Sequence, residues 1–313
     1  MAFLNLIRYK NLLIIALLQI LLRYGLIIPI LDYYQIQPVL STALFAVLVF
    51  STVMLAASGY VINDYFDVRI DRVNRPGRVV VGNTISRRLV LLMHVLFTLA
   101  GVFAGLLISF VFRKESYALM FVALPVLLWY YSTIFKKQML VGNIVIALLT
   151  ALVPYVVVSV EFTALVNQYG YDITNGEACS AAWFWTTGFA FFAFITNLVR
   201  EIIKDMEDIK GDRLGGCHTL PIEMGIVNSK IVVNVLLGFM LVVIWGVYFY
   251  IPEIKQIPMA LPYLIGLLSV PVVMLMVKVH LARRTISFHR AGTLGKIVML
   301  LGILFIALVG MLY

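Results

Sequence analysis

Charged residues are scarce in this sequence of 313 residues. Only 12% are Asp, Glu, Lys or Arg, whereas 63% are hydrophobic, and the mean hydropathy is +1.02. The length alone would allow two soluble domains, but this composition excludes them. Because no low-complexity tract or linker divides the sequence, we predict a single membrane-embedded domain over residues 1–313.

Cysteine and histidine are also rare. Cys179 and Cys217 are the only cysteines, and we expect them in loops on opposite sides of a membrane, which excludes a disulfide between them. His94 and His218 have no partner at the spacing of metal ligands, and we interpret them as packing or loop residues. A disulfide framework and a histidine metal site are therefore not expected.

Long apolar runs dominate what remains. Spanning a bilayer takes about 20 apolar residues, and nine segments approach or exceed that length. Eight contain no charged residue, and the first contains only Arg23. Backbone groups in lipid need internal hydrogen bonds, and the alternation typical of a barrel is absent, so an all-α polytopic membrane bundle of nine transmembrane helices is predicted. The segments are residues 11–31, 38–62, 89–112, 117–135, 138–160, 181–199, 231–250, 257–277 and 297–313.

Basic residues predict the orientation of these spans. With the N-terminus in the cytoplasm, 20 of the 24 Lys and Arg fall on the inner side, and only Arg113, Lys114 and Lys255 fall outside. This asymmetry follows the positive-inside rule. The net charge of +9 then reflects topology and anionic headgroups, and needs no nucleic acid partner. The outer loop 161–180, which begins at Glu161, is interpreted as a solvated connection.

Arg23 is the one charge within a predicted span, one turn after Gln19 on the same helix face. An intramembrane Arg is by default a functional hypothesis. We considered three interpretations: a pair with Asp32, an approach to a substrate, and extension of the side chain to the outer interface.

Two short acidic motifs, 141 positions apart, have identical spacing. Steps of three and then four residues place three carboxylates on one face of a helix. Such anions repel each other and resist desolvation at a membrane edge. One motif alone would more often be a solvated helix end, but two on the same side of the membrane indicate a shared cation, and oxygen ligands favour Mg²⁺. The carboxylates are Asp64, Asp67 and Asp71 in NDYFDVRID, and Asp205, Asp208 and Asp212 in KDMEDIKGD.

Each motif has polar neighbours that suit a metal and a polyphosphate. Asn63 adds a neutral oxygen ligand, and guanidinium groups at positions 69, 72, 75 and 78 are suited to phosphate, although the positive-inside rule also accounts for them. Pro76-Gly77 is expected to end the helix that carries the first acidic motif. In the second motif, Asn197 and Glu201 extend the acidic face, Arg200 and Lys204 flank it, and Glu207 is expected to face solvent.

These segments resemble the UbiA superfamily of intramembrane prenyltransferases. The resemblance is carried by NDYFDVRID with DRVNRPGR, by REIIKDMEDIKGD with TLPIEMG, and by YSTIFKKQMLVGN between them. These motifs touch spans one to six, and the nine-span pattern of the family fits the whole chain. Many relatives have Arg-Pro at Arg78-Val79, and this departure affects the expected loop geometry more than the activity.

The resemblance implies a prenyltransferase that moves a prenyl group from an isoprenyl diphosphate to a lipid-soluble or amphiphilic acceptor, with Mg²⁺ as cofactor. It implies a multi-pass protein of a prokaryotic cell membrane whose active site faces the cytoplasm, with no obligatory protein partner. The expected metal ligands are Asn63, Asp64, Asp67, Asp71, Asp205, Asp208 and Asp212. The expected catalytic residues are Asp67, Asp208 and Lys136. The expected diphosphate contacts are Arg72, Arg78, Lys137, Lys204, Asn11 and Tyr131.

The chemistry explains these residue types. Pyrophosphate leaves an allylic carbon only when its developing charge is neutralised. The allylic carbocation then needs a dry cavity with aromatic faces. Candidate aromatic residues are Tyr130, Tyr131, Trp183, Trp185, Phe191, Phe192 and Phe194, although each is more often a packing residue.

Several alternatives remain open in the sequence. REIIKDMEDIKGD with TLPIEMG is most similar to the digeranylgeranylglyceryl phosphate synthase group, which favours a glycerol phosphate acceptor over an aromatic acceptor of quinone biosynthesis. A secondary transporter would also use paired acidic clusters, but near the bilayer midplane instead of at helix ends. A CDP-alcohol phosphotransferase would need a D-G-x2-A-R element, which is missing. Recurrence of the acidic motif four spans later is compatible with a duplicated four-helix unit plus a ninth helix.

Overall fold

The computed structural model describes residues 1–257 and 259–313, without the side chain of Arg78. Within this part, nine helical segments are long and apolar enough to cross a membrane. The all-α prediction is therefore confirmed, and the chain is a multi-pass integral membrane protein. The spans are formed by α2 (Tyr9–Leu22) with η1 (Arg23–Ile27) and α3 (Ile28–Tyr33), α4 (Thr42–Asn74), α5 (Arg87–Phe112), α6 (Glu115–Thr133), α7 (Val141–Tyr169), α8 (Glu177–Leu214), α10 (Gly225–Tyr250), α11 (Ala260–Tyr263) with η6 (Leu264–Ser269) and α12 (Val270–Leu281), and α13 (Thr285–Val309).

Short helical pieces connect these spans. They are α1 (Ala2–Leu6), η2 (Pro76–Arg78), η3 (Phe135–Lys137), η4 (Tyr171–Asn175), α9 (Leu220–Glu223), η5 (Pro252–Gln256) and η7 (Gly310–Leu312). Cys179 lies in the first turn of α8 and not in a loop as expected, whereas Cys217 follows the end of α8. Both are buried free thiols.

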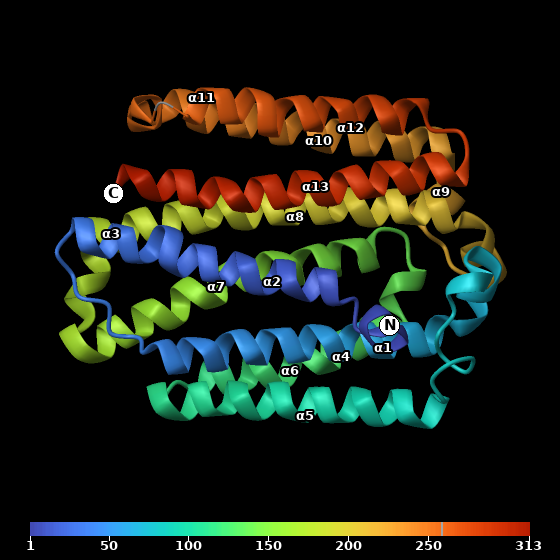
Figure 1. Ribbon diagram of the computed structural model, residues 1–313, viewed down its shortest axis with the longest axis horizontal. Helices are drawn as coiled ribbons and strands as arrows, with labels where there is room; N and C mark the ends of the chain where they lie inside the picture. Colours follow the sequence, from blue (N-terminus) through green and yellow to red (C-terminus); the bar gives the residue numbers. More distant parts are fainter. Residues whose placement is uncertain (258) are drawn as a thin grey trace.

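The spans run roughly parallel to the long axis of the molecule (Figure 1). Helices α10 and α12 form one outer layer, α4, α5 and α6 form the other, and α2, α7, α8 and α13 lie between them. Helix α8 is central, because it packs against α4, α7, α10 and α13. The chain termini lie toward opposite ends of the molecule (Figure 1), as an odd number of spans requires.

The two helices that carry the acidic motifs are the longest, with 33 residues in α4 and 38 in α8. Helix α4 begins after Ser41, whose Oγ accepts a hydrogen bond from the Leu44 amide at 3.2 Å, a common N-cap arrangement. It ends at Asn74, directly before Arg75-Pro76, so the predicted helix end is confirmed. The acidic motifs are thus the last helical turns of spans, not separate loops.

One predicted loop is wrong. Helix α7 continues to Tyr169, so Glu161 lies within a helix and is fully buried instead of solvated. Its Oε2 accepts a hydrogen bond from Arg23 Nε at 2.9 Å, and Arg23 also donates to the Leu40 carbonyl. Arg23 therefore pairs with a residue 138 positions away and not with Asp32. Each buried charge offsets the desolvation of the other.

A small second hydrophobic core supports the loop between α4 and α5. Leu6, Val61, Val68, Val81 and Val90 pack together, separately from the large core that runs through the bundle. These residues tie α1, α4, α5 and the segment after η2 to one another. The loop that follows the first acidic motif is therefore anchored close to the end of α4.

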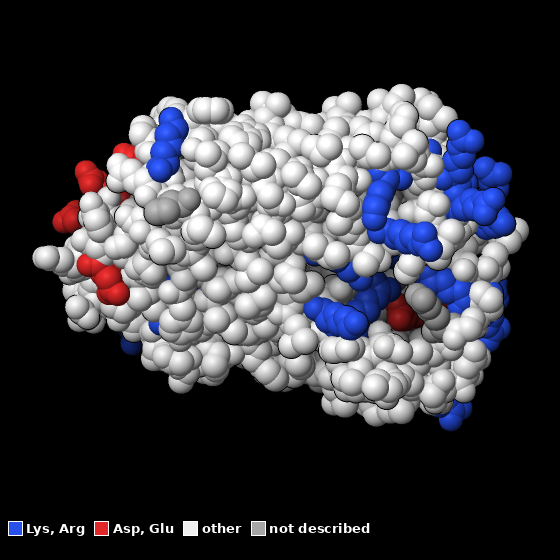
Figure 2. Space-filling view, turned by 45° about the horizontal axis from the view of Figure 1, so that its top comes forward, with Lys and Arg blue, Asp and Glu red and all other residues white. Residues whose placement is uncertain are grey.

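The two ends of the molecule differ in charge. Figure 2 shows Lys and Arg crowded at one end, around a hollow in which acidic atoms are visible, and mostly acidic residues at the opposite end. Uncharged surface lies between them, as expected of a face that contacts lipid.

Candidate active site

The two acidic helix ends are tied together. The Gly211 amide in α8 donates a hydrogen bond to Asn74 Oδ1 at the end of α4, at 2.8 Å. The Arg75 Nη2 atom lies 3.0 Å from both oxygens of Asp208 and 3.1 Å from Glu207 Oε1. The two motifs therefore meet at one place, as their matched spacing suggested.

Glu207 corrects one expectation. Instead of facing solvent, it is mostly buried and contacts both Arg75 and His289 Nδ1, the latter at 3.0 Å. Helix α13, which carries His289, packs against α8 and covers this face. The sequence indicated the helix face correctly but contained no local sign that another helix would lie against it.

A small polar chamber of about 60 Å³ lies between the helix ends, and we call it the acidic chamber. Both motifs line it, together with the segment that follows α6 and with α7. Its lining residues are Asn63, Asp67, Ile70, Asp71, Tyr131, Lys136, Gly142, Asn143, Glu201, Lys204, Asp205, Asp208, Asp212, Cys217 and Thr219. Six carboxylates face two ammonium groups there, so the lining has a formal charge of −4.

A larger cavity of about 200 Å³, here called the apolar cavity, extends from the chamber into the bundle. Residues of α2, α4, α6, α7, α8 and α13 line it, and most are aliphatic or aromatic. The two spaces share Asn63, Tyr131, Glu201 and Lys204. A charged group held in the chamber could therefore continue directly into an apolar chain in the cavity.

Side chains of the segment YSTIFKKQMLVGN, residues 131–143 and here called the middle segment, hold carboxylates of both motifs in place. Lys136 forms an ion pair with Asp67, whose other oxygen accepts a hydrogen bond from Asn63 Nδ2 at 2.7 Å. Asn143 Nδ2 donates to Asp205 Oδ2 at 2.7 Å. One carboxylate of each motif is thus oriented by an amide group.

Gly142 explains how this segment can pass so close to the chamber. A Cβ atom at this position would lie 2.6 Å from Lys136 Cα, which is closer than side-chain carbons approach backbone. Only glycine therefore allows the start of α7 to pack against η3. This close contact positions Lys136 beside Asp67.

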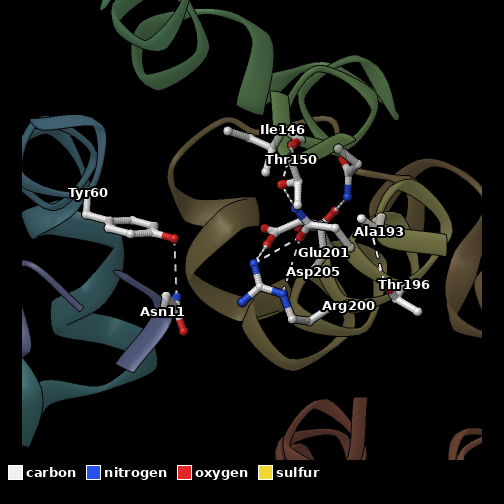
Figure 3. A network of polar contacts seen from close by, with 11 residues as sticks. Asn11, Tyr60, Ile146, Thr150, Ala193, Thr196, Arg200, Glu201 and Asp205 are labelled. Carbon is white, nitrogen blue, oxygen red and sulfur yellow. Dashed lines mark hydrogen bonds and ion pairs between the residues drawn. The ribbon is translucent and has the colours of Figure 1, made fainter. Parts of the chain in front are cut away.

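The remaining predicted site residues are distributed unevenly. Asp64 lies outside the chamber and pairs with Arg8 at 2.8 Å. Arg72 and Lys137 are exposed and line neither cavity, and the side chain of Arg78 lies outside the described part of the structure. Asn11 lines the apolar cavity, where its amide donates to Tyr60 Oη at 3.4 Å (Figure 3).

Sequence reasoning missed several residues that line the two spaces. Asn143 belongs to the Gly-Asn pair that ends YSTIFKKQMLVGN, so the family resemblance could have indicated it as a site residue. Arg8 and Lys296 line the apolar cavity, but in the sequence they were indistinguishable from the other cations of the loops. Arg200, expected to flank the acidic face, lines the same cavity. Figure 3 shows Arg200 and Glu201 on α8 facing Asn11 and Tyr60 from α2 and α4.

Cys217, in the lining of the acidic chamber, is a buried thiol close to a carboxylate. Burial raises the pKa of this thiol to about 11, and the nearby Asp212 carboxylate adds to the shift. Both causes disfavour the thiolate. The thiol is therefore neutral at physiological pH.

A sequence model described as the UbiA prenyltransferase family matches residues 26–291. The chain belongs to this family. A digeranylgeranylglyceryl phosphate synthase of Methanothermobacter thermautotrophicus is 34% identical over 76% of this chain and 72% of its own length.

Solved structures of the family share the fold. A UbiA homologue from Aeropyrum pernix K1 superposes with a TM-score of 0.62 at 15% identity, covering 91% of this chain and 94% of its own. A UbiA homologue from Archaeoglobus fulgidus, bound to DMAPP and Mg²⁺, superposes with a TM-score of 0.57 at 17% identity, covering 98% and 99%. The likeness in structure establishes the fold, and the match to the family establishes that the chain is a prenyltransferase.

The residues of this UbiA family chamber fit a hard divalent cation. The carboxylate and amide groups that line it offer oxygen ligands, and Asn63 Oδ1 is buried without a hydrogen-bond partner. Among the described residues, no three His, Cys, Asp or Glu side chains are close enough together to hold an ion by themselves. Mg²⁺ usually takes one or two protein carboxylates and completes its octahedron with phosphate and water.

Aromatic side chains line the apolar cavity of this UbiA family member, in part as expected. Tyr131 and Phe192 were predicted and are present, together with Tyr60, Phe121 and Phe189. The other aromatic candidates lie outside the lining: Tyr130, Trp183, Trp185, Phe191 and Phe194. Tyr131 is the aromatic residue shared by the chamber and the cavity.

Proposed function

We propose that this prenyltransferase transfers a geranylgeranyl group from its diphosphate to the free hydroxyl of geranylgeranylglyceryl phosphate, with Mg²⁺ as cofactor. One observation carries the proposal: an acidic chamber opens into an apolar cavity through shared residues. A prenyl diphosphate has the same division into a charged head and an apolar tail. The relative named digeranylgeranylglyceryl phosphate synthase supports the choice of acceptor.

In this proposal the diphosphate occupies the acidic chamber. Lys136 and Lys204 line it and donate to phosphate oxygens. Mg²⁺ would be held by one or two of the chamber carboxylates, with Asn63 Oδ1 available as a neutral ligand and diphosphate oxygens completing its shell. The candidate carboxylates are Asp67, Asp71, Asp205, Asp208 and Asp212. When bound, it neutralises the charge that develops on the leaving pyrophosphate.

The bond between the allylic carbon and oxygen breaks, and pyrophosphate keeps the electron pair. The acceptor oxygen then forms a bond to that carbon, and its proton passes to the released pyrophosphate. The prenyl chain lies in the apolar cavity, which excludes water from the allylic cation. Tyr131 lies where the two spaces meet, so its ring is available to the developing positive charge.

We place the site on the cytoplasmic side of a prokaryotic cell membrane. The end of the molecule that contains the acidic chamber also carries the crowd of Lys and Arg (Figure 2). The positive-inside rule assigns such an end to the cytoplasm. Water-soluble diphosphate and Mg²⁺ would then reach the chamber directly.

The test uses purified protein in lipid nanodiscs, with product identified by mass spectrometry. We expect the digeranylgeranyl product with Mg²⁺ and none with excess EDTA. Asp67→Asn and Asp208→Asn should each lower kcat by roughly 100-fold or more, because preorganised electrostatic groups contribute on this scale. Asp172→Asn, in the exposed η4 at the other end of the molecule, is the matched control and should keep wild-type activity.

The outcome that contradicts this function is equally specific. Wild-type activity in both chamber variants would show that the carboxylates hold no catalytic ion. Product formed only with an aromatic acceptor would leave prenyl transfer intact and overturn the choice of acceptor.

A further inference from the structure

The two spaces of the active site carry opposite charges. The acidic chamber is lined with a net formal charge of −4, whereas the apolar cavity has four cations and one carboxylate in its lining, a net charge of +3. An apolar chain makes no use of cations beside it, and among the described residues only two of these four pair with a carboxylate, Arg8 with Asp64 and Arg200 with Glu201. The positive charge of the apolar cavity is therefore not explained by the prenyl tail.

Three of these cations come from three different elements. Arg8 precedes α2, Arg200 lies in α8 and Lys296 lies in α13. Residues 8, 200 and 296 are far apart in sequence, and packing of α13 against α8 and α2 brings their helices together. We call these three residues the cationic rim.

The rim residues are held in position. Arg8 adopts a left-handed backbone conformation with φ 51°, which is uncommon for residues other than glycine. Its guanidinium lies 2.8 Å from Asp64 and 5.0 Å from the centre of the Tyr60 ring. Arg200 Nη2 lies 2.5 Å from Glu201 and 3.1 Å from Asn197 Oδ1.

Lys296 differs from the other two. It is exposed at the mouth of the apolar cavity, and among the described residues its ammonium has no ion-pair partner. The positive-inside rule accounts for cations anywhere on this face, such as Arg290 on the same helix. It does not account for three cations gathered around one cavity.

We propose that the cationic rim binds the phosphate monoester of the acceptor, separately from the diphosphate of the donor. This inference rests on the proposed function and assigns a second anion subsite within the same active site. A phosphate monoester carries up to two negative charges, and Arg and Lys are suited to phosphate oxygens.

The position of the rim suits an acceptor better than a donor. The leaving pyrophosphate belongs with the metal ligands of the acidic chamber, so the acceptor hydroxyl has to reach the allylic carbon from the apolar cavity. The two spaces meet at Tyr131 and Lys204, which line both. A phosphate held at the rim leaves the hydroxyl of the same glycerol free to point toward this junction.

The experiment compares Lys296→Gln and Lys296→Arg with the wild-type protein in nanodiscs. Initial rates are measured while geranylgeranylglyceryl phosphate and geranylgeranyl diphosphate are varied in turn. We expect Lys296→Gln to raise the KM of the acceptor by about tenfold, with the donor KM and kcat within twofold of wild type. Lys296→Arg, which keeps the charge, should restore most of the acceptor affinity.

Two controls separate binding from folding. Arg290→Gln removes an exposed cation from the same helix but lines neither cavity, and it should leave both KM values unchanged. The thermal unfolding midpoint should be the same for all variants, because Lys296 is exposed and forms no ion pair within the part of the chain that the structure describes. In the wild-type protein, kcat/KM should be higher for geranylgeranylglyceryl phosphate than for geranylgeranylglycerol. Lys296→Gln should lower the ratio of these two values.

Each other outcome overturns the inference. An unchanged acceptor KM in Lys296→Gln would remove the rim from substrate binding while leaving the proposed function intact. An equal rise in both KM values would assign the rim to the donor diphosphate. If the wild-type protein transfers no prenyl group to the phosphorylated acceptor, or prefers a hydroxybenzoate, the proposed function fails together with the rim.

Discussion

At the scale of single residues, the Arg23–Glu161 pair shows how the bundle holds a charge inside a membrane. Both side chains are almost fully buried, with exposed fractions of 3% and 0%. A buried ion pair is weak evidence for stability by itself, but removal of one partner leaves an uncompensated charge. This pair lies in the bundle far from the acidic helix ends and lines neither cavity, so its effects should appear in stability.

We therefore expect Arg23→Met alone to destabilise the protein by about 3–5 kcal/mol, because Glu161 would remain charged and buried. Arg23→Met combined with Glu161→Leu should recover most of that loss. The measurement is the thermal unfolding midpoint in detergent. If the double variant is no more stable than the single variant, the pair is not the cause of the loss.

The pKa of Cys217 provides a second test at this scale. Burial and the Asp212 carboxylate raise this pKa from an ordinary value of 9.0 to about 11. A raised pKa of an acid favours its neutral form, so the thiolate should appear only as the pH approaches 11. At pH 8 its fraction is about a hundredfold below that of an ordinary thiol.

The measurement is the rate of alkylation by iodoacetamide as a function of pH. It is made in a Cys179→Ser background, so that only Cys217 can react. The rate should still rise above pH 10. An inflection near pH 9 would show that neither burial nor the chamber carboxylates act on this thiol.

At the scale of elements, the decisive feature is the contact between the ends of α4 and α8. The acidic spacing indicated two carboxylate faces, but the tie between them uses Asn74 and Gly211, which belong to the motif segments but were given no role there. Gly211 matters because a Cβ there would lie 2.5 Å from Asn74 Nδ2. A larger residue would displace the Asn74 side chain and break the hydrogen bond that ties the two helix ends together.

Gly211→Ala should therefore raise the Mg²⁺ concentration that gives half-maximal activity by several-fold, with helix content unchanged. Gly238→Ala is the matched control, because a Cβ at this position in α10 would meet no atom within 4 Å. The measurement is activity as a function of Mg²⁺ concentration. Equal curves for the two variants would show that the distance between the helix ends does not affect metal binding.

At the scale of the whole molecule, the end with the acidic chamber and the opposite end should face different compartments. Lys210 is exposed near the end of α8, and Glu253 is exposed in η5 at the far end of α10. In a background without Cys179 and Cys217, Lys210→Cys and Glu253→Cys can each be labelled with a membrane-impermeant maleimide.

In spheroplasts, whose cell membrane is sealed, Glu253→Cys should react and Lys210→Cys should not. Inverted vesicles should give the reverse, and detergent should make both reactive, which is the control for accessibility. The opposite pattern would place the acidic chamber outside the cytoplasm and contradict the positive-inside prediction.

The sequence by itself determined the nine spans and the two carboxylate faces, because hydropathy and helical spacing are properties of neighbouring residues. Only the tertiary structure decided which distant groups meet: Glu161 with Arg23, Arg75 with Asp208, and the cations at positions 8, 200 and 296 around one cavity. The physical reason is that electrostatic pairing depends on distance in space and burial. Helix packing sets both, across separations in sequence that no local pattern records.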